Sequence, residues 1–523
     1  MSTREPALFA SSRPFPHRWR LVGRRLHFTH RVIPPQLHLR DPLYAAILLF
    51  IASLQGAALW TADAFWQEKT GEWILAHGQV PHVDVFSGTA RGTPWVVQEW
   101  LANTLLAALN HIDHILPFVL MTFVIDATCL LMYVRARSAN ANPQWALIVT
   151  AIAIIGFGSF FWMRMFWWSY LLLNLTLWLL EDYQRTPSLR ILLLIPLMAL
   201  WTNLHSGVIL GILVIVMFWL TTHPRIAAAI NQTGHLHAHA LSKTAWSRLV
   251  LVGVLAIAAT LATPNGIDQL AYSLLNGTDP DQINQIDEWL SPNFHNQQGA
   301  RFGLFLAAML ALLFTRRHIP VEVALLLLGF GAMAFYELRN IPILVVALAP
   351  MVAATFADAP EQNQWIRTRA LQVLPHIAWW RAGVALLCLA LLSGTVWQTR
   401  QHYDTYGGEN YYPMAAVDYL VEHRIPGQVF NDYVFGGYLI YKGIPPFVDG
   451  RSDLYVKTNV FRDYLDVSNG SVDPDPIFRK YHVTHVLIKP DSYLASELMQ
   501  RGWTTLYSDG MAVILVPPTQ RST

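Results

Sequence analysis

A carboxylate lies among tryptophans near the beginning of the chain. Asp63 comes directly after a long apolar run, and Trp66 follows one helical turn later in the string W-T-A-D-A-F-W-Q-E-K-T-G-E-W-I-L. A carboxyl group partly buried beside aromatic rings has a raised pKa and a fixed geometry, and both properties suit a general base. Asp84 and Glu99 follow in the same polar segment and are further candidate carboxylates. The alternative is that Asp63 only caps the next helical turn.

Two arginines lie in short turns between apolar runs. Arg164 is found in G-S-F-F-W-M-R-M-F-W-W-S, and Arg339 is found in F-Y-E-L-R-N-I-P. A guanidinium group donates parallel hydrogen bonds and keeps its charge, so it suits the recognition of a phosphate group. The alternatives are that each arginine anchors its helix among lipid headgroups, or that Arg339 simply pairs with Glu337.

Two other turns carry polar side chains suited to a sugar. His205, in W-T-N-L-H-S-G, offers ring nitrogens that could bind a sugar or a phosphate. Glu288 and Trp289, in I-D-E-W-L-S-P, set a carboxylate beside an aromatic ring, which suits the hydroxyls and the ring face of a carbohydrate. Either turn is also compatible with no ligand.

A second group of candidates lies near the C-terminus. The strings V-F-N-D-Y-V-F-G-G-Y-L and F-V-D-G-R-S-D-L-Y place Asp432, Asp449 and Arg451 at the ends of two predicted strands, with Asn431 and Asp453 beside them. In α/β layers the carboxyl ends of strands are where ligands bind. The alternative is that these Asp–Arg pairs fasten loops to the rest of the protein.

The composition indicates a membrane protein. Of the 523 residues, 54% are hydrophobic and 13% are charged, whereas soluble domains are about a quarter charged. Since a helix needs about 20 mainly apolar residues to cross a bilayer, we predict a polytopic α-helical membrane protein with about 11 transmembrane helices. The expected spans are residues 42–60, 114–134, 144–161, 165–180, 190–202, 207–222, 249–263, 301–315, 320–336, 341–356 and 381–397.

Charge and cysteine content exclude several classes. The net charge of +2 provides no field that would attract nucleic acid. Cys129 and Cys388 lie within apolar runs, which indicates buried thiols rather than a disulfide framework or a metal site. Lys and Arg gather in alternate connecting segments, Arg135 and Arg137 among them, which predicts a cytoplasmic N-terminus and an outer C-terminus.

The texture of the chain changes after residue 398. There, β-rich runs alternate with amphipathic stretches, which predicts an α/β layer domain. The apolar stretch at 97–110 is too short to cross a membrane and suits a helix lying on its surface. The predicted parts are a basic cytoplasmic tail (1–41), a transmembrane domain (42–397) with outer loops at 61–113 and 264–300, and a soluble α/β domain (398–523).

Several strings resemble a known superfamily. D-x-x-W with T-G-E-W-I-L-A-H-G-Q-V-P-H-V-D-V-F-S and P-W-V-V-Q-E-W-L resembles the first outer loop of the GT-C superfamily, whose members are polytopic glycosyltransferases that use polyprenyl-phosphate-linked sugars. V-F-N-D-Y-x-x-G-G-Y-L and V-D-G-R-x-D-L-Y resemble the C-terminal domain of a bacterial branch. The resemblance implies a GT-C-like fold over most of the chain.

The resemblance also implies roles for particular residues. The superfamily's acidic residue beyond the first span serves as a catalytic base or a metal-linked carboxylate, and Asp63 matches that position. The superfamily's acidic pair is often adjacent, whereas alanines flank Asp63 here. This departure argues against a metal site, although Mg²⁺ or Mn²⁺ remains open, and it moves the second carboxylate to Asp84 or Glu99. Arg164 and Arg339 suit the donor phosphate.

The expected activity is glycosyl transfer at the periplasmic face of a bacterial inner membrane. A polyprenyl-phosphate-linked sugar would be the donor, and a lipid, a glycan or a protein would be the acceptor. Asp63 would take the acceptor's proton, and a single displacement would invert the anomeric centre. Two other classes stay open. One is a transporter or flippase of lipid-linked substrates, although no internal repeat is visible. The other is a non-catalytic scaffold in envelope polysaccharide assembly.

Overall fold

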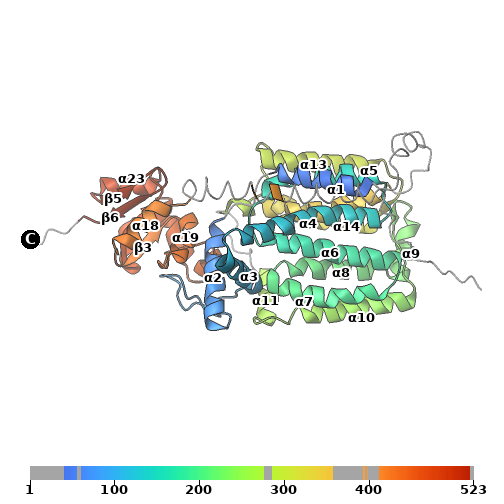
Figure 1. Cartoon of the computed structure of the whole chain (residues 1–523), viewed down its shortest axis with the longest axis horizontal. Helices are drawn as coiled ribbons and strands as arrows, with labels where there is room; N and C mark the ends of the chain where they lie inside the picture. The colour runs from blue at the N-terminus through green and yellow to red at the C-terminus, as the bar shows by residue number, and fades with distance from the viewer. Residues whose placement is uncertain are drawn as a thin grey trace, which may run out of the picture. The chain divides into compact units, whose positions relative to one another are not determined.

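The computed structural model describes residues 40–55, 61–275, 286–356 and 412–518, together with residues 393, 394 and 397. The part before residue 357 is helical (Figure 1). Its helices are α1 (Arg40–Ser53), α2 (Ala62–His77), α3 (Trp100–Ile112), α4 (Leu116–Ser138), α5 (Pro143–Gly156), η1 (Gly158–Phe160), α6 (Phe166–Arg185), η2 (Leu189–Leu193), α7 (Leu194–Leu204), α8 (Val208–Thr221), α9 (Pro224–Gln232), α10 (Lys243–Ala259), α11 (Ile267–Leu275), η3 (Asp287–Trp289), α13 (Gln297–Phe314), α14 (Val321–Tyr336), η4 (Leu338–Asn340) and α15 (Ile341–Ala354). Two short parallel strands, β1 (Leu236–His237) and β2 (Ile319–Pro320), join two connecting segments.

Among the described residues, two helices, α4 and α13, are long and apolar enough by themselves to cross a membrane. Helices α8 and α9 meet the same test as a pair but are bent by 73° at their junction. Shorter apolar helices are Asp41–Ser53, Pro143–Gly156, Leu189–Leu204, Val321–Tyr336 and Leu338–Ala354. The predicted total of 11 spans is therefore not confirmed, and the predicted tail at 1–41 and last span at 381–397 lie largely outside the described residues.

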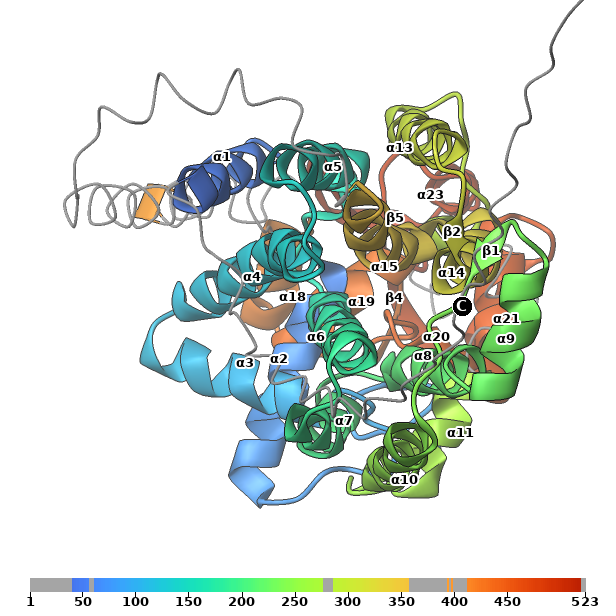
Figure 2. The ribbon, with the colours of Figure 1, turned by 90° about the vertical axis from the view of Figure 1, so that its right-hand side faces the viewer.

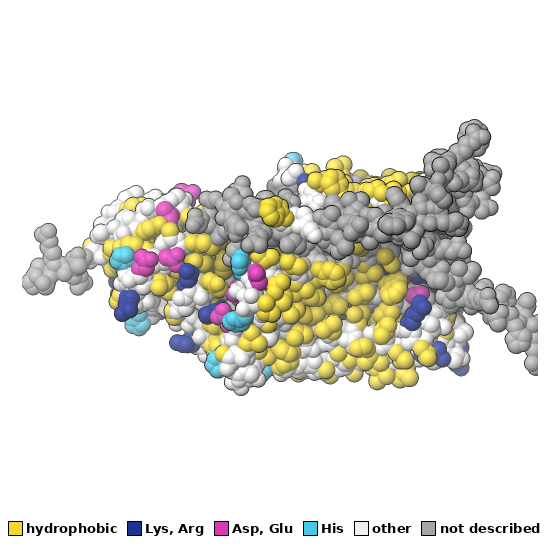
Figure 3. All heavy atoms as spheres, viewed as in Figure 1, with side chains coloured by type: hydrophobic (Ala, Val, Ile, Leu, Met, Phe, Trp, Pro, Cys, Tyr) yellow, Lys and Arg dark blue, Asp and Glu magenta, His cyan; other side chains and the backbone are white. Residues whose placement is uncertain are grey.

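The surface of the helical part is mainly apolar. Figure 3 shows hydrophobic side chains covering most of the visible face of the helices, with charged side chains gathered toward their two ends. Exposed large side chains include Leu213 and Leu220 of α8 and Leu251 and Leu255 of α10. A contiguous apolar surface of this kind is typical of a protein that faces lipid or a partner.

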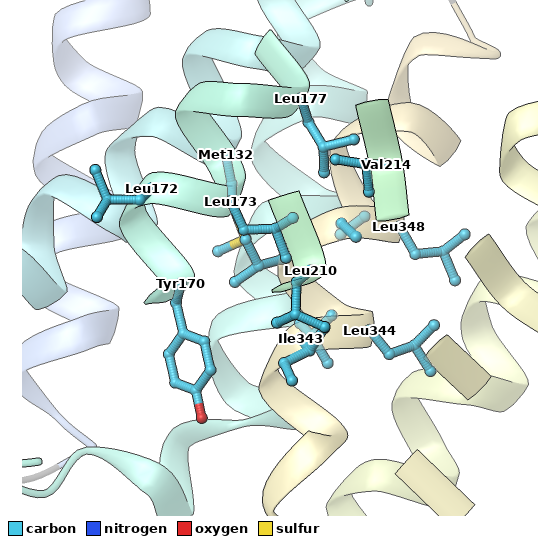
Figure 4. Packing of buried hydrophobic residues seen from close by; sticks show 14 of the residues in the cluster. Met132, Tyr170, Leu172, Leu173, Leu177, Leu210, Val214, Ile343, Leu344 and Leu348 are labelled. Carbon is cyan, nitrogen blue, oxygen red and sulfur yellow. The ribbon is translucent and has the colours of Figure 1, made fainter. Parts of the chain in front are cut away.

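Helix α15 forms the centre of the helical part. Every residue from Ile341 to Ala353 is buried, and a helix that is apolar on all sides belongs in the interior. It packs against α4, α5, α6 and α14, among which Figure 2 shows it. In Figure 4, side chains of α15 such as Leu344 lie beside those of α6 and α8, Leu210 among them.

A buried arginine completes the hydrogen bonding of α15. Pro350 has no N–H, so the Val346 carbonyl one turn earlier has no partner within the helix. Arg135 of α4 donates Nη1 to that carbonyl at 2.9 Å and Nη2 to Glu181 of α6 at 2.6 Å. Arg135 is 0% exposed. The sequence pattern predicted Arg135 as a charge of a cytoplasmic connecting segment, whereas its side chain lies buried among the helices.

The predicted α/β layer is present after residue 411. Its sheet has the order β3-β4-β6-β5, with β3 and β4 parallel and the remaining pairs antiparallel. Helices pack on the buried apolar side chains of the central strands β4 and β6. The elements are α18 (Met414–Glu422), β3 (Gln428–Asn431), η5 (Tyr433–Phe435), α19 (Gly436–Tyr441), α20 (Ser452–Lys457), α21 (Val460–Ser468), α22 (Pro474–Lys480), β4 (Val483–Ile488), α23 (Tyr493–Gln500), β5 (Thr504–Ser508) and β6 (Val513–Val516).

Helix α2 and the segment that follows it contact the α/β layer. The helix packs along α3 on one side and against α19 on the other. The glycines of F-G-G-Y-L permit this approach, since a Cβ at Gly437 would lie 2.1 Å from the Ala62 carbonyl oxygen. Gly436 is equally confined, by the Val448 carbonyl oxygen at the same distance. The sequence motif therefore brings the C-terminal layer onto the first turn of α2, where Asp63 lies.

Candidate functional site

Asp63 and Arg164 meet where α2 begins. Asp63 lies in the first helical turn, where the helix dipole favours negative charge, and Arg164 lies between η1 and α6. Thr61, the N-cap residue of α2, donates its hydroxyl to the Met163 carbonyl at 3.3 Å and so ties the two segments together. Arg164 Nη1 lies 4.0 Å from Asp63 Oδ2 and also binds the Glu288 carboxylate of η3. We call Asp63, Arg164 and Glu288 the arginine–carboxylate centre.

The centre remains partly open to its surroundings. The side chains of Asp63, Arg164 and Glu288 are 27%, 31% and 28% exposed. Trp66 donates its indole N–H to Asp63 Oδ1 at 3.1 Å, which fixes the plane of the carboxylate. Burial raises the pKa of Asp63 above its ordinary value, Arg164 and Trp66 act in the opposite direction, and Glu288 adds to the rise. An oriented carboxylate with a raised pKa has the properties of a general base.

The short helix η3 connects the two predicted arginines. Glu288 binds Arg164, while the next residue, Trp289, lies under the Arg339 guanidinium, 3.6 Å from its ring centroid. Arg339 Nε donates to Glu337 at 2.9 Å, as one alternative from the sequence had it. Among the described residues, the two Nη groups of Arg339 form no hydrogen bond, so they remain available as donors to a ligand. The structure thus brings Asp63, both arginines, Glu288 and Trp289 together.

His205 lies in the same region as an uncharged ring. Its Nδ1 accepts the Gly207 N–H at 2.9 Å and lies 2.8 Å from the Ser169 hydroxyl. Because Nδ1 is an acceptor, the neutral ring carries its proton on Nε2. Burial lowers the pKa of His205 to about 3, with the charge of Arg339 adding to the shift. His205 therefore offers a neutral Nε2–H donor near Arg339.

Asp84, Asp449 and Arg451 form a buried ion triad rather than part of the centre. Arg451 donates Nη1 to Asp84 at 2.6 Å and binds both oxygens of Asp449, at 2.8 and 2.7 Å. Ser87 and Tyr455 donate to the same carboxylates. The side chains of the triad are at most 1% exposed. This geometry favours the fastening role that the sequence left open, joining the segment after α2 to the C-terminal layer.

The remaining two predicted site residues lie in different places. Asp432 caps η5 by accepting the Val434 N–H at 3.2 Å, and its charged neighbours are Lys489 and Asp491 rather than the centre. Glu99 is buried at the N-cap of α3 and accepts from Gln67 at 3.1 Å. Gln67 lies one helical turn after Asp63 on α2, so Glu99 is linked to the helix that carries Asp63 but is not a member of the centre.

The C-terminal layer supplies residues that the sequence analysis did not select. A Cβ at Gly450 would lie 2.2 Å from Asp63 Oδ1, so the D-G-R turn passes directly over the carboxylate. Tyr433 donates its hydroxyl to the Gly450 carbonyl at 3.2 Å, and the charge of Asp63 contributes to its raised pKa after the larger effect of burial. In the sequence, the signal for this contact was the glycine of V-D-G-R, which stands between two charged residues and lets the turn approach Asp63 closely.

The residues at the centre do not form a clear metal site. Among the residues that the structure describes, no group of three or more His, Cys, Asp or Glu side chains is placed to hold a metal ion. The carboxylates of Asp63 and Glu288 both contact the Arg164 guanidinium. The donor set therefore fits an internal cation better than a bound divalent one.

Comparison with solved structures identifies the fold. The archaeal oligosaccharyltransferase AglB from Archaeoglobus fulgidus, solved with an inhibitory peptide and a dolichol-phosphate, matches 92% of this chain over 75% of its own, at 11% identity and a TM-score of 0.53. An oligosaccharyltransferase from the same organism, tethered to an acceptor peptide containing the NVT sequon, matches with the same coverage at 12% identity and a TM-score of 0.51. The chain has the GT-C fold. The GT-C-like fold predicted from the sequence is thereby confirmed.

Sequence comparison alone does not reach these proteins. No protein-family model matches the chain, and no curated protein matches it in sequence. At 11% and 12% identity the structural likeness establishes the GT-C fold. This likeness does not establish the substrates of the chain, for which its own arginine–carboxylate centre is the guide.

Proposed function

We propose that this chain is a GT-C-type glycosyltransferase, which moves a sugar from a polyprenyl-phosphate-linked donor to a lipid, glycan or protein acceptor. The observation that supports it most strongly is the pairing of Asp63 with Arg164 at the start of α2, within a GT-C fold. The fold neighbour AglB was solved with a dolichol-phosphate. The arginine–carboxylate centre also lies at the ends of apolar helices, which is consistent with a donor that carries a lipid chain.

Each group of the centre has a distinct task in this proposal. The donor phosphate binds the guanidinium groups of Arg164 and Arg339, which donate charge-assisted hydrogen bonds. Both arginines are held in place before the substrate arrives, Arg164 by Glu288 and Arg339 by Glu337 and Trp289. Preorganised positive charge of this kind stabilises the negative charge that grows on the leaving phosphate.

Asp63 is the general base of the reaction. Its Oδ2 faces Arg164, so the acceptor is activated next to the place where the phosphate leaves. As the acceptor attacks the anomeric carbon, its proton passes to the Asp63 carboxylate and the bond from that carbon to the phosphate oxygen breaks. A single displacement inverts the anomeric centre. Arg164 supplies the positive charge at this point, so we assign no step to Mg²⁺ or Mn²⁺, and addition of a chelator tests this directly.

We place this reaction at the periplasmic face of a bacterial inner membrane. The proposed orientation rests on the bias of Lys and Arg along the sequence, which predicts a cytoplasmic N-terminus. The segment with Asp63 would then face outward together with the C-terminal layer. Labelling an introduced cysteine at the exposed Thr505 from either side of the membrane tests the assignment.

The test of the function separates binding from transfer. Asp63→Asn keeps the size of the side chain but removes the base, so transfer from a panel of polyprenyl-phosphate hexoses and pentoses should fall by about 10²- to 10⁴-fold. Binding of polyprenyl phosphate should be retained. The matched control is Asp113→Asn, which changes an exposed carboxylate at the end of α3. If Asp63→Asn transfers sugar as the wild type does, the proposed role of Asp63 is wrong.

A further inference from the structure

Glu99 is a buried carboxyl group that the proposed reaction does not use. It is 4% exposed, and its Oε1 accepts the Gln67 amide at 3.1 Å. Its Oε2 is buried and has no hydrogen-bond partner among the described residues. An ionised carboxylate in this state would carry a large desolvation cost, whereas a protonated carboxyl carries a much smaller one. The local geometry therefore favours the neutral form.

The side chains packed directly beside Glu99 at the start of α3 are uncharged amides. Gln67 of α2 and Asn103 of α3 lie beside it in what we call the α2–α3 seam, defined by Gln67, Glu99 and Asn103. Within the described residues, Gln67 Oε1 and both polar atoms of the Asn103 side chain are buried without partners. The seam contains no cation of its own that would stabilise an anionic Glu99.

The backbone around Glu99 is held from two sides. Asn265 donates its side-chain amide to the Val97 carbonyl at 3.2 Å, and Gln269 of α11 donates to the Gln98 carbonyl at 2.8 Å. On the other side, Trp100 donates its indole N–H to Asn203 at 2.7 Å. These contacts fix the orientation of Glu99. Its charge state therefore acts on the centre from a constant position.

Three titratable or charged groups face Glu99 from the elements packed around it. They are Asp63 of α2, Arg164 before α6 and Tyr272 of α11. Burial raises the pKa of Glu99 to about 8, Asp63 adds to the rise, and Gln67 and Arg164 oppose it without cancelling it. Burial also raises the pKa of Tyr272, so that group stays protonated near pH 8. Glu99 is therefore expected to lose its proton between pH 7 and pH 9.

We propose that Glu99 is a positioning residue that works in its uncharged, protonated form, and that it keeps the arginine–carboxylate centre able to accept a phosphate group. Asp63 and Glu288 already place two negative charges against Arg164. A third carboxylate behind them would repel the phosphate and compete for the guanidinium. This role differs from that of a second catalytic carboxylate, and it rests on the proposed function for the identity of the ligand.

The first experiment measures binding of undecaprenyl phosphate at pH 7 and pH 9. The phosphate has its second pKa near 6, so the ligand itself changes little over this range. We expect the wild-type affinity to fall by about fivefold or more as Glu99 ionises. In Glu99→Gln, which keeps the size and the partner of the side chain but cannot ionise, the ratio of the two affinities should be close to one. Glu72→Gln, a change at a partly exposed glutamate of α2, should retain the wild-type fall.

A second measurement tests the charge state without a ligand. Infrared difference spectra of wild type minus Glu99→Gln should show the carbonyl stretch of a protonated carboxyl group at pH 7, and this band should vanish above pH 9. Glu68→Gln controls for a second buried glutamate, which lies on α2. If the difference at pH 7 is that of an ionised carboxylate, or if Glu99→Gln leaves the fall in affinity intact, the inference is overturned. If the wild type binds no undecaprenyl phosphate at any pH, the proposed function fails, and the infrared result alone decides the state of Glu99.

Discussion

Replacement of Arg451 by Met tests how the C-terminal layer is held on the rest of the protein. The guanidinium makes three donations to Asp84 and Asp449 at 2.6 to 2.8 Å and lies 4.6 Å from the Trp95 ring centroid. Met preserves much of the apolar stem but leaves two fully buried carboxylates without their cation. Removing one partner of a buried ion pair costs about 3–5 kcal/mol. Since Arg451 serves two carboxylates, we expect the upper part of that range.

The assay is thermal unfolding combined with limited proteolysis of the purified protein. A loss of about 3 kcal/mol or more corresponds to at least about a hundredfold larger population in which the layer has separated from α2. Cleavage within residues 412–518 should accelerate accordingly. The control is Arg501→Met, because Arg501 pairs with Asp473 and Glu497 at an exposed site, where an ion pair contributes under about 1 kcal/mol. Equal effects of the two substitutions would refute a supporting role for the triad.

Three further outcomes follow from the same geometry. Burial works to raise the pKa of Asp84, but Arg451 and Ser87 outweigh it and hold the pKa below its ordinary value. The stability that this ion pair contributes should therefore be complete above about pH 4 and be lost in stronger acid. Acid unfolding of Asp84→Asn should lack that loss. Arg135→Met should destabilise the helical part by about 3–5 kcal/mol in denaturant or thermal unfolding, because Glu181 and the Val346 carbonyl lose their buried donor. Gly450→Ala should reduce sugar transfer with little change in the melting temperature, because the new Cβ meets the Asp63 carboxylate and displaces it; unchanged transfer would show that the D-G-R turn does not constrain Asp63.

The sequence predicted the charged residues at and beside the arginine–carboxylate centre because ionisable side chains are unusual in their local setting. Asp63, Arg164 and Arg339 are ionisable groups at the ends of apolar runs, where such groups are costly. Glu288 and Trp289 were predicted to contact carbohydrate, which stays a prediction, and the structure shows in addition that they contact Arg164 and Arg339. Glu288 and Arg164 are 124 positions apart, and local spacing contains no information about their pairing.

The sequence was less informative about the ion triad and the helices. Asp84 was a candidate second carboxylate, yet its partner is Arg451, 367 positions later, and only the folded chain brings them together. Hydropathy predicted apolar segments correctly as helices, but many of them are shorter than a membrane span. Arg135 shows the limit of counting charges, since a residue at the end of an apolar run can donate a buried hydrogen bond to a proline-containing helix rather than be a loop charge.

The most direct test of the centre is the affinity for polyprenyl phosphate of the wild type and of Arg164→Gln, measured in the same detergent at pH 7. Loss of a charge-assisted donor to phosphate should weaken binding by about 10- to 100-fold, with Arg164→Lys between the two. Arg91→Gln removes an exposed arginine from the segment after α2 and should bind as the wild type does. Equal affinities for wild type and Arg164→Gln, with both proteins folded, would contradict a phosphate site at Asp63 and Arg164.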